Sequence, residues 1–122
     1  MGKPVKYTAL AALTMLTASL SMAPQGASAA SAESVKMGEK IAFDRKIGNC
    51  LACHQTGTGT SPGDIGPPLV AMKARFPDPA KLRAQIHDPR TANPDTRMPP
   101  FGAHGILSGS DIDAIVDYLL TL

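Results

Sequence analysis

The sequence predicts an all-α domain of modest size. Apolar residues recur at helical spacing near its C-terminus, no segment alternates as a half-buried strand does, and proline and glycine divide the rest into short helices and loops. There is no Trp, and aromatic residues make up 4% of the chain. Because a domain this small buries only roughly two thirds of its surface, we expect its core to need apolar material beyond its own side chains.

The first 29 residues are typical of a cleaved secretory signal peptide. Lys3 and Lys6 supply a positive start, residues 7–22 form an apolar stretch diluted by Thr and Ser, and the small residues at 27–29 resemble a cleavage site. The stretch is too short and hydroxyl-rich to span a bilayer, which needs about 20 apolar residues, and no cysteine directly follows it. We therefore expect an exported periplasmic protein, with its mature domain at residues 30–122 and no membrane anchor.

The mature domain is close to electrically neutral. Both leader lysines leave with the signal peptide, so ten basic and ten acidic residues remain. A nucleic-acid-binding domain shows a clustered basic excess, and we expect no nucleic-acid partner. One local basic group predicts either a solvated face or a docking patch for an acidic partner; it consists of Lys73, Arg75, Lys81 and Arg83.

The first half of the mature domain predicts a helix, a short helical turn, a loop and a second helix. The first helix is expected over residues 35–46, with Ser34 as its N-cap. The turn follows Gly48, and residues 55–66 form the loop, being rich in Gly, Thr and Ser. Pro67-Pro68 is expected to start the second helix, whose apolar face carries Leu69, Met72 and Phe76.

The second half predicts two helices separated by a long irregular segment. Residues 80–87 form the shorter helix, and residues 88–107 are too rich in proline for regular structure. Loops this long in a compact domain are usually functional. The last helix is the clearest, because Ser108 to Asp111 provides an N-cap and an acidic first turn. Its apolar face comprises Ile112, Ile115, Val116, Leu119 and Leu120.

The short turn carries the residues Cys50-Leu51-Ala52-Cys53-His54, a C-x-x-C-H run. This run is the attachment site of c-type haem. Thiols three residues apart on a helical turn share a face, so both can form thioethers to one porphyrin. The histidine that follows can then be the proximal iron ligand. A zinc site would require further ligands, and the chain has no other cysteine.

Met98 is the leading candidate for the sixth iron ligand. It lies in a stiff, proline-rich segment ahead of the last helix, and a thioether opposite His raises the reduction potential, as electron transfer favours. His104, in the same segment, is the main rival. Met72 is expected to be a core residue and Met37 a packing residue. His87 is expected to be a capping or surface histidine.

Pro67 is the candidate partner of the proximal histidine. Haem-ligating histidines need an acceptor for their second ring nitrogen. A rigid proline turn could aim its carbonyl at His54, while still serving as a helix start.

The element order is that of the small class I cytochrome c fold, in which helices wrap around one covalently bound haem c. Within that fold, the chain resembles the SoxX family, the small monohaem subunits of the SoxAX cytochromes of bacterial sulfur oxidation. The resemblance covers nearly all of the mature domain and implies haem attachment at Cys50 and Cys53, axial ligands His54 and Met98, and Pro67 beside His54. It rests on GNCLACH (48–54), GDIGPPL (63–69) and NPDTRMPPFGAHGILSGSDIDAIVDYLLTL (93–122).

The resemblance also implies a reaction and partners. SoxAX couples thiosulfate oxidatively to a carrier-protein cysteine, an L-cysteine S-thiosulfotransferase activity, with catalysis on the haem of the larger SoxA subunit. A SoxX-like chain would form a heterodimer with that subunit and pass electrons to a downstream cytochrome. The residues agree, because sulfur transfer needs a spare thiol or an open iron position and neither is expected here. The alternatives are a free-standing soluble periplasmic electron carrier, and a haem enzyme or gas sensor with an open sixth position.

Overall fold

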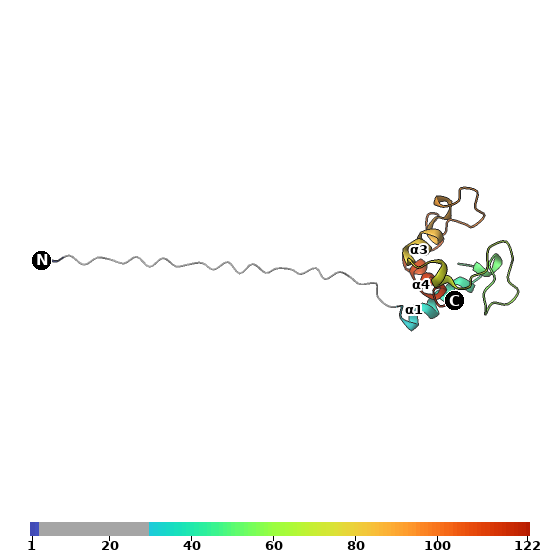
Figure 1. Ribbon diagram of the computed structural model, residues 1–122, viewed down its shortest axis with the longest axis horizontal. Helices are drawn as coiled ribbons and strands as arrows, with labels where there is room; N and C mark the ends of the chain where they lie inside the picture. Colours follow the sequence, from blue (N-terminus) through green and yellow to red (C-terminus); the bar gives the residue numbers. More distant parts are fainter. Residues whose placement is uncertain (3–29) are drawn as a thin grey trace.

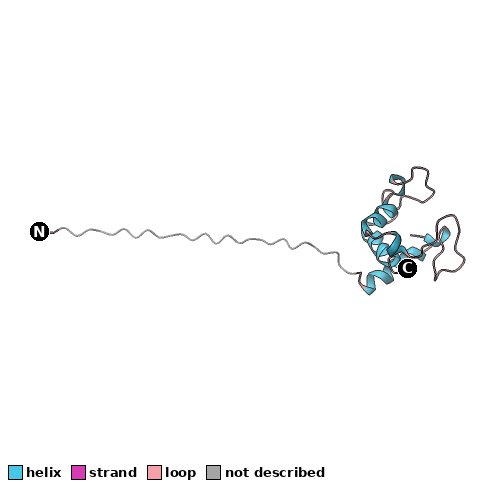
Figure 2. Ribbon diagram, viewed as in Figure 1, coloured by secondary structure: helices cyan, strands magenta, loops and turns pink. Residues whose placement is uncertain are grey.

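The computed structural model describes residues 1–2 and 30–122, so the predicted leader lies almost wholly outside the described residues. The described residues are helical and contain no strand (Figure 2), as the sequence predicted. Figure 1 shows the helices in chain order. They are α1 (Ala32–Phe43), the 3-10 helix η1 (Cys50–Ala52), α2 (Met72–Arg75), α3 (Pro79–His87), the 3-10 helix η2 (Pro89–Thr91) and α4 (Gly109–Leu119).

The first and last long helices, α1 and α4, pack against each other (Figure 1). Gly38 allows their close approach, because a Cβ at this position would collide with the backbone carbonyl of Ala114. The Phe43 ring meets Tyr118 edge-on, with ring centroids 5.8 Å apart. The helices at the two ends of the domain, α1 and α4, are therefore held in contact at a single close crossing.

Helix α4 forms as the sequence predicted. Ser108 and Asp111 make a reciprocal capping box, in which each side chain accepts a hydrogen bond from the other residue's backbone N–H, at 3.1 and 3.0 Å. Ile112 and Ile115 are fully buried. Helix α3 packs alongside, and Arg83 donates to Asp113 of α4 at 2.6 Å.

The buried core draws on every α-helix. Helix α4 contributes more of the buried side chains than any other helix. The core consists of Ile41, Ala42, Leu69, Met72, Leu82, Ile86, Leu107, Ile112, Ile115, Val116, Tyr118 and Leu119. Among the described residues, no helix is both long and apolar enough to cross a bilayer.

The predicted start and end of the first helix are wrong. The N-cap is Ser31 and not Ser34, because the Ser31 hydroxyl accepts from the Ser34 N–H at 3.0 Å. The Ser34 hydroxyl instead donates to Asp117 of α4. The helix ends at Phe43 and not at residue 46, because Asp44 turns to extended backbone.

The helix predicted from Pro67-Pro68 is also misplaced. Residues 67–70 are irregular, and α2 begins only at Met72, after Ala71 in a left-handed conformation (φ 50°). The reason is tertiary: the Leu69 N–H donates to the Gln55 carbonyl at 2.8 Å. The segment is thus held along the C-x-x-C-H run instead of coiling into a helix.

Candidate haem site

The C-x-x-C-H residues lie on one tight turn. The backbone N–H groups of Cys53 and His54 both donate to the Cys50 carbonyl, at 3.2 and 2.9 Å. Asn49, in a left-handed conformation (φ 47°), precedes the turn and redirects the chain into it. Both thiols and the imidazole therefore project from a single helical turn, as joint attachment to one porphyrin requires.

The two thiols are half-buried and do not form a disulfide. Cys50 also contacts the hydrophobic core. Burial raises its pKa to about 11, and the nearby Cys53 adds to the rise while a backbone hydrogen bond opposes it. Because reactive and redox thiols have lowered pKa values, this environment does not favour a redox dithiol.

The His54 ring is held by the predicted proline turn. Its Nδ1 lies 2.7 Å from the Pro67 carbonyl oxygen. Since a carbonyl only accepts, Nδ1 must carry the proton, which leaves Nε2 free to ligate a metal. Gly66 faces the same ring: a Cβ at this position would collide with the imidazole. Sequence analysis missed Gly66, whose only signal was its place directly before Pro67-Pro68.

Two backbone hydrogen bonds attach the proline turn to the haem-attachment motif. The Gly66 N–H donates to the Cys53 carbonyl at 2.8 Å, and Leu69 bonds to Gln55 at the same distance. The Pro67 carbonyl is thereby placed beside His54 by contacts on either side of the proline pair.

Met98 lies in the long segment between η2 and α4. Its side chain is half-buried and packs against the hydrophobic core, and its N–H donates to the Thr96 hydroxyl at 3.2 Å. Met98 and Cys50 therefore border the same buried cluster. The role of Met98 as the sixth ligand stays a prediction.

The rival ligands occupy different surroundings. Met72 is 2% exposed and belongs to the core, as predicted, whereas Met37 is 49% exposed, so its prediction as a packing residue is wrong. His87 is exposed, as expected. His104 is also exposed, and its Nε2 lies 3.5 Å from Arg90 Nη1. Arg90 in turn pairs with Asp88 at 2.8 Å and holds the pKa of that carboxyl at about 2.

The segment after Met98 is anchored to the end of α3. The N–H groups of Gly102 and Ala103 both donate to the His87 carbonyl at 3.0 Å. A Cβ at Gly102 would collide with the His87 imidazole. His87 thus acts as a support for the Met98 segment, a role that sequence analysis did not anticipate.

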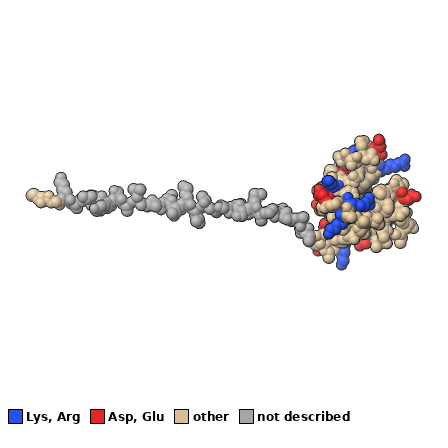
Figure 3. Space-filling view, in the orientation of Figure 1, with Lys and Arg blue, Asp and Glu red and all other residues tan. Residues whose placement is uncertain are grey.

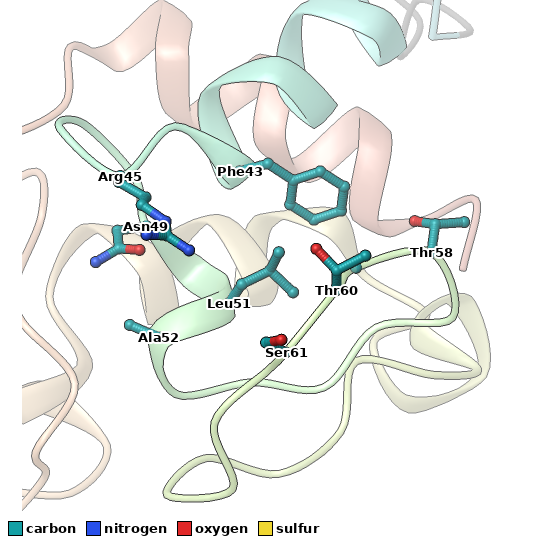
Figure 4. Close-up of a pocket in the computed structure, with 9 residues that line it drawn as sticks. Phe43, Arg45, Asn49, Leu51, Ala52, Thr58, Thr60 and Ser61 are labelled. Carbon is teal, nitrogen blue, oxygen red and sulfur yellow. The ribbon is translucent and has the colours of Figure 1, made fainter.

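An open hollow of about 460 Å³ lies against the haem-attachment turn (Figure 4). In Figure 4, Leu51 lies between the Phe43 ring of α1 and the loop that carries Thr58, Thr60 and Ser61. Leu51 and Ala52, the residues between the two cysteines, line it, and the predicted haem residues do not. The hollow is therefore separate from the predicted haem ligands.

The predicted basic group does not act as one patch. Arg83 is paired with Asp113, and Arg75 donates to the Pro68 carbonyl, so two of its four cations are engaged within the domain. Figure 3 shows basic and acidic side chains interspersed over the visible face.

The donor set fits a covalently attached haem. Two thiols, an imidazole with a free Nε2 and a thioether are the groups that such a haem takes, and the absence of a Cβ at Gly66 leaves room for the imidazole. Elsewhere in residues 1–2 and 30–122, no cluster of His, Cys, Asp and Glu could hold a metal ion.

Comparison with known proteins defines the class. Residues 34–119 match the family described as "Cytochrome C oxidase, cbb3-type, subunit III". The chain belongs to this family of cytochrome c domains, and it is an electron-transfer cytochrome with covalently bound haem c. The helical architecture is that of a small class I cytochrome c, as the sequence predicted.

A solved structure narrows the class. The chain is 29% identical to a chain in the crystal structure of SoxXA from P. pantotrophus, with a TM-score of 0.64, covering 70% of this chain and 79% of that one. The protein is a SoxX-like small cytochrome, in agreement with the sequence resemblance.

A second relative comes from Aquifex aeolicus (strain VF5) and is named an uncharacterized lipoprotein. The two are 37% identical over 75 residues, 61% of this chain. The chain spans 36% of that relative's length.

Proposed function

We propose that this cytochrome relays electrons within a two-subunit sulfur-oxidising cytochrome and does not itself perform the sulfur chemistry. The reaction joins thiosulfate to a carrier-protein cysteine: the thiol S–H bond breaks, an S–S bond forms to the terminal sulfur of thiosulfate, and one proton and two electrons leave. The chain would receive these electrons one at a time from a larger SoxA-type subunit and deliver them to a downstream cytochrome.

One feature carries the proposal: a haem held as we propose would occupy every chemistry-bearing group of the site. Cys50 and Cys53 are the chain's only thiols, and thioether formation consumes both. His54 and Met98 supply the two axial ligands. Such a site has no nucleophile and no open iron position for a sulfur substrate, but it suits electron transfer, which a bound haem with His and Met ligands supports.

The partner and the compartment belong to the same proposal. Support comes from the relative solved as SoxXA, which motivates a heterodimer with a larger haem subunit. The leader-like residues 1–29 motivate export, with haem attachment and function of residues 30–122 in the periplasm.

Reconstitution with the larger subunit tests the division of labour. The purified holoprotein alone should accept electrons from a chemical reductant but should not add thiosulfate to the carrier cysteine. Adding the larger haem subunit, with thiosulfate and an electron acceptor that takes the two released electrons, should yield the modified carrier, which gains the mass of the added group. Mass spectrometry of the carrier measures this directly, and a catalytically competent isolated chain would overturn the proposal.

The alternative is a free-standing periplasmic electron carrier, which the same ligand set also suits. Gentle purification from the native host separates the two functions. A relay subunit should co-purify with a second, larger haem protein. A free carrier should elute alone and should still accept and donate electrons.

A further inference from the structure

Arg75, the last residue of α2, points back to the chain segment that precedes its own helix. Its Nη1 donates to the Pro68 carbonyl at 2.7 Å and lies 3.5 Å from the Met72 sulfur. Among the residues that the structure describes, Arg75 forms no ion pair. Its one strong contact is therefore with the proline turn, although sequence analysis placed it in a surface basic group.

That turn has few polar groups by which it can be held. Pro67 and Pro68 lack N–H groups, so between Gly66 and Leu69 only two carbonyls are available. One carbonyl, of Pro67, accepts from His54 Nδ1 at 2.7 Å. The next, of Pro68, accepts from Arg75. The two bonds fix consecutive peptide units on the proximal side of the candidate haem site.

We propose that Arg75 is a positioning residue for the proximal histidine. By holding the Pro68 carbonyl through a charge-assisted hydrogen bond, it fixes the orientation of the proline turn and so keeps the Pro67 carbonyl in line with His54 Nδ1. The inference rests on the proposed role of His54 as the proximal ligand.

The expected consequence is electronic as well as structural. The hydrogen bond at Nδ1 sets the ring orientation and raises the basicity of the ligating nitrogen. Without Arg75, the turn should move more freely, the Nδ1–H should exchange with solvent faster, and the hyperfine-shifted signals of the His54 ring should move. Loss of a positive charge by itself would change the reduction potential of the haem, but it would not speed the solvent exchange of the His54 Nδ1–H.

The helix offers a matched control. Lys73 lies on α2 two residues earlier, is exposed, and forms no ion pair among the described residues. Lys73→Leu removes the same charge from the same helix without touching the turn. Arg75→Lys keeps a cation that can still donate to the Pro68 carbonyl.

The test is nuclear magnetic resonance of the holoprotein labelled with ¹⁵N-histidine. Arg75→Leu should speed solvent exchange of the His54 Nδ1–H several-fold and shift the ring signals. Arg75→Lys should restore much of the protection, and Lys73→Leu should match the wild type. If Arg75→Leu does not fold, Arg75→Gln, which keeps a neutral donor, should show an intermediate exchange rate.

Failure of the His54 ligand assignment and failure of the Arg75 positioning role give different results. If the wild-type His54 signals show no hyperfine shift, the ligand role of His54 fails and the proposed site with it. If His54 is ligated but Arg75→Leu and Lys73→Leu behave alike, the positioning role of Arg75 is overturned while the proposed function stands.

Discussion

At the scale of single residues, His54 is the most constrained side chain of the site. The Pro67 carbonyl fixes its tautomer, and the imidazole lies so close to Gly66 that a Cβ there would collide with it. Met98 is held less directly, through core packing and the anchoring of its segment on His87. The side proposed as proximal is therefore preorganised by direct contacts, and the side proposed as distal by its loop.

Met98→Ala tests the distal side. The variant should retain covalent haem, because both thiols remain, but lose the far-red thioether-to-iron charge-transfer band and fall in reduction potential. Absorption spectra and a redox titration of the purified holoprotein measure both effects. His104→Ala is the matched control and should keep the band. Loss of the band in His104→Ala, with the band kept in Met98→Ala, would reverse the ligand assignment.

The site residues also mark how far sequence reasoning reaches. The short turn at residues 50–54 and the contact between Pro67 and His54 could be predicted, because the first is a local pattern and the second follows from a known ligand need. Gly66 and Arg75 could not, because their roles depend on contacts across the turn that no spacing rule encodes. The prediction for Met37 was also wrong. Residue spacing did not show which side of α1 packs on α4, and the Met37 side chain lies on the exposed side.

At the scale of elements, the crossing of α1 and α4 organises the domain. It could not be predicted in detail, because a glycine within a helix gives no sequence sign of what lies against it. The last helix could be predicted, because its cap and apolar face are both local patterns. The helix expected at Pro67-Pro68 failed because tertiary hydrogen bonds, such as that from Leu69 to Gln55, outweighed the local preference.

Gly38→Ala should weaken this crossing. The added methyl group would collide with the Ala114 carbonyl, and overpacking of this kind costs about 1–3 kcal/mol. Gly57→Ala is the control, since nothing lies within 4 Å of a Cβ there. Urea unfolding of the two holoproteins should show a lower midpoint for Gly38→Ala alone, and equal midpoints would contradict the close approach.

The capping box of α4 predicts a dependence on pH. Hydrogen bonds from Ser108 lower the pKa of Asp111 below its usual value of 3.8. A carboxyl with a lowered folded pKa stabilises the fold above that usual value, and the contribution is lost as the pH falls through the folded pKa. Ser108→Ala should therefore cost about 1 kcal/mol at pH 7, and less near pH 2. A cost that does not change with pH in denaturant titrations would show that the carboxylate plays no part.

At the scale of the whole molecule, a small hydrophobic core must support long loops around the candidate haem site. The buried cluster contains one aromatic residue, Tyr118, and two long segments, residues 53–71 and 92–108, extend as loops from the helices (Figure 1). A covalently held porphyrin adds apolar surface where the side chains supply little. Folding and haem attachment should therefore be coupled.

The double variant Cys50→Ala with Cys53→Ala tests this coupling. Without covalent haem, the exported chain should be largely disordered or degraded. Circular dichroism and thermal unfolding of the purified variant measure the remaining structure. A cooperative transition close to that of the holoprotein would show that the helices alone suffice.

The central claim is that this cytochrome carries electrons for a sulfur reaction that another subunit catalyses. The most direct measurement is the mass of the carrier protein after incubation with thiosulfate, an electron acceptor and the purified holoprotein, with and without the larger haem subunit. We predict an unmodified carrier with this chain alone and a thiosulfate-modified cysteine once both subunits are present. Modification by this chain alone, or none with both subunits, would contradict the account.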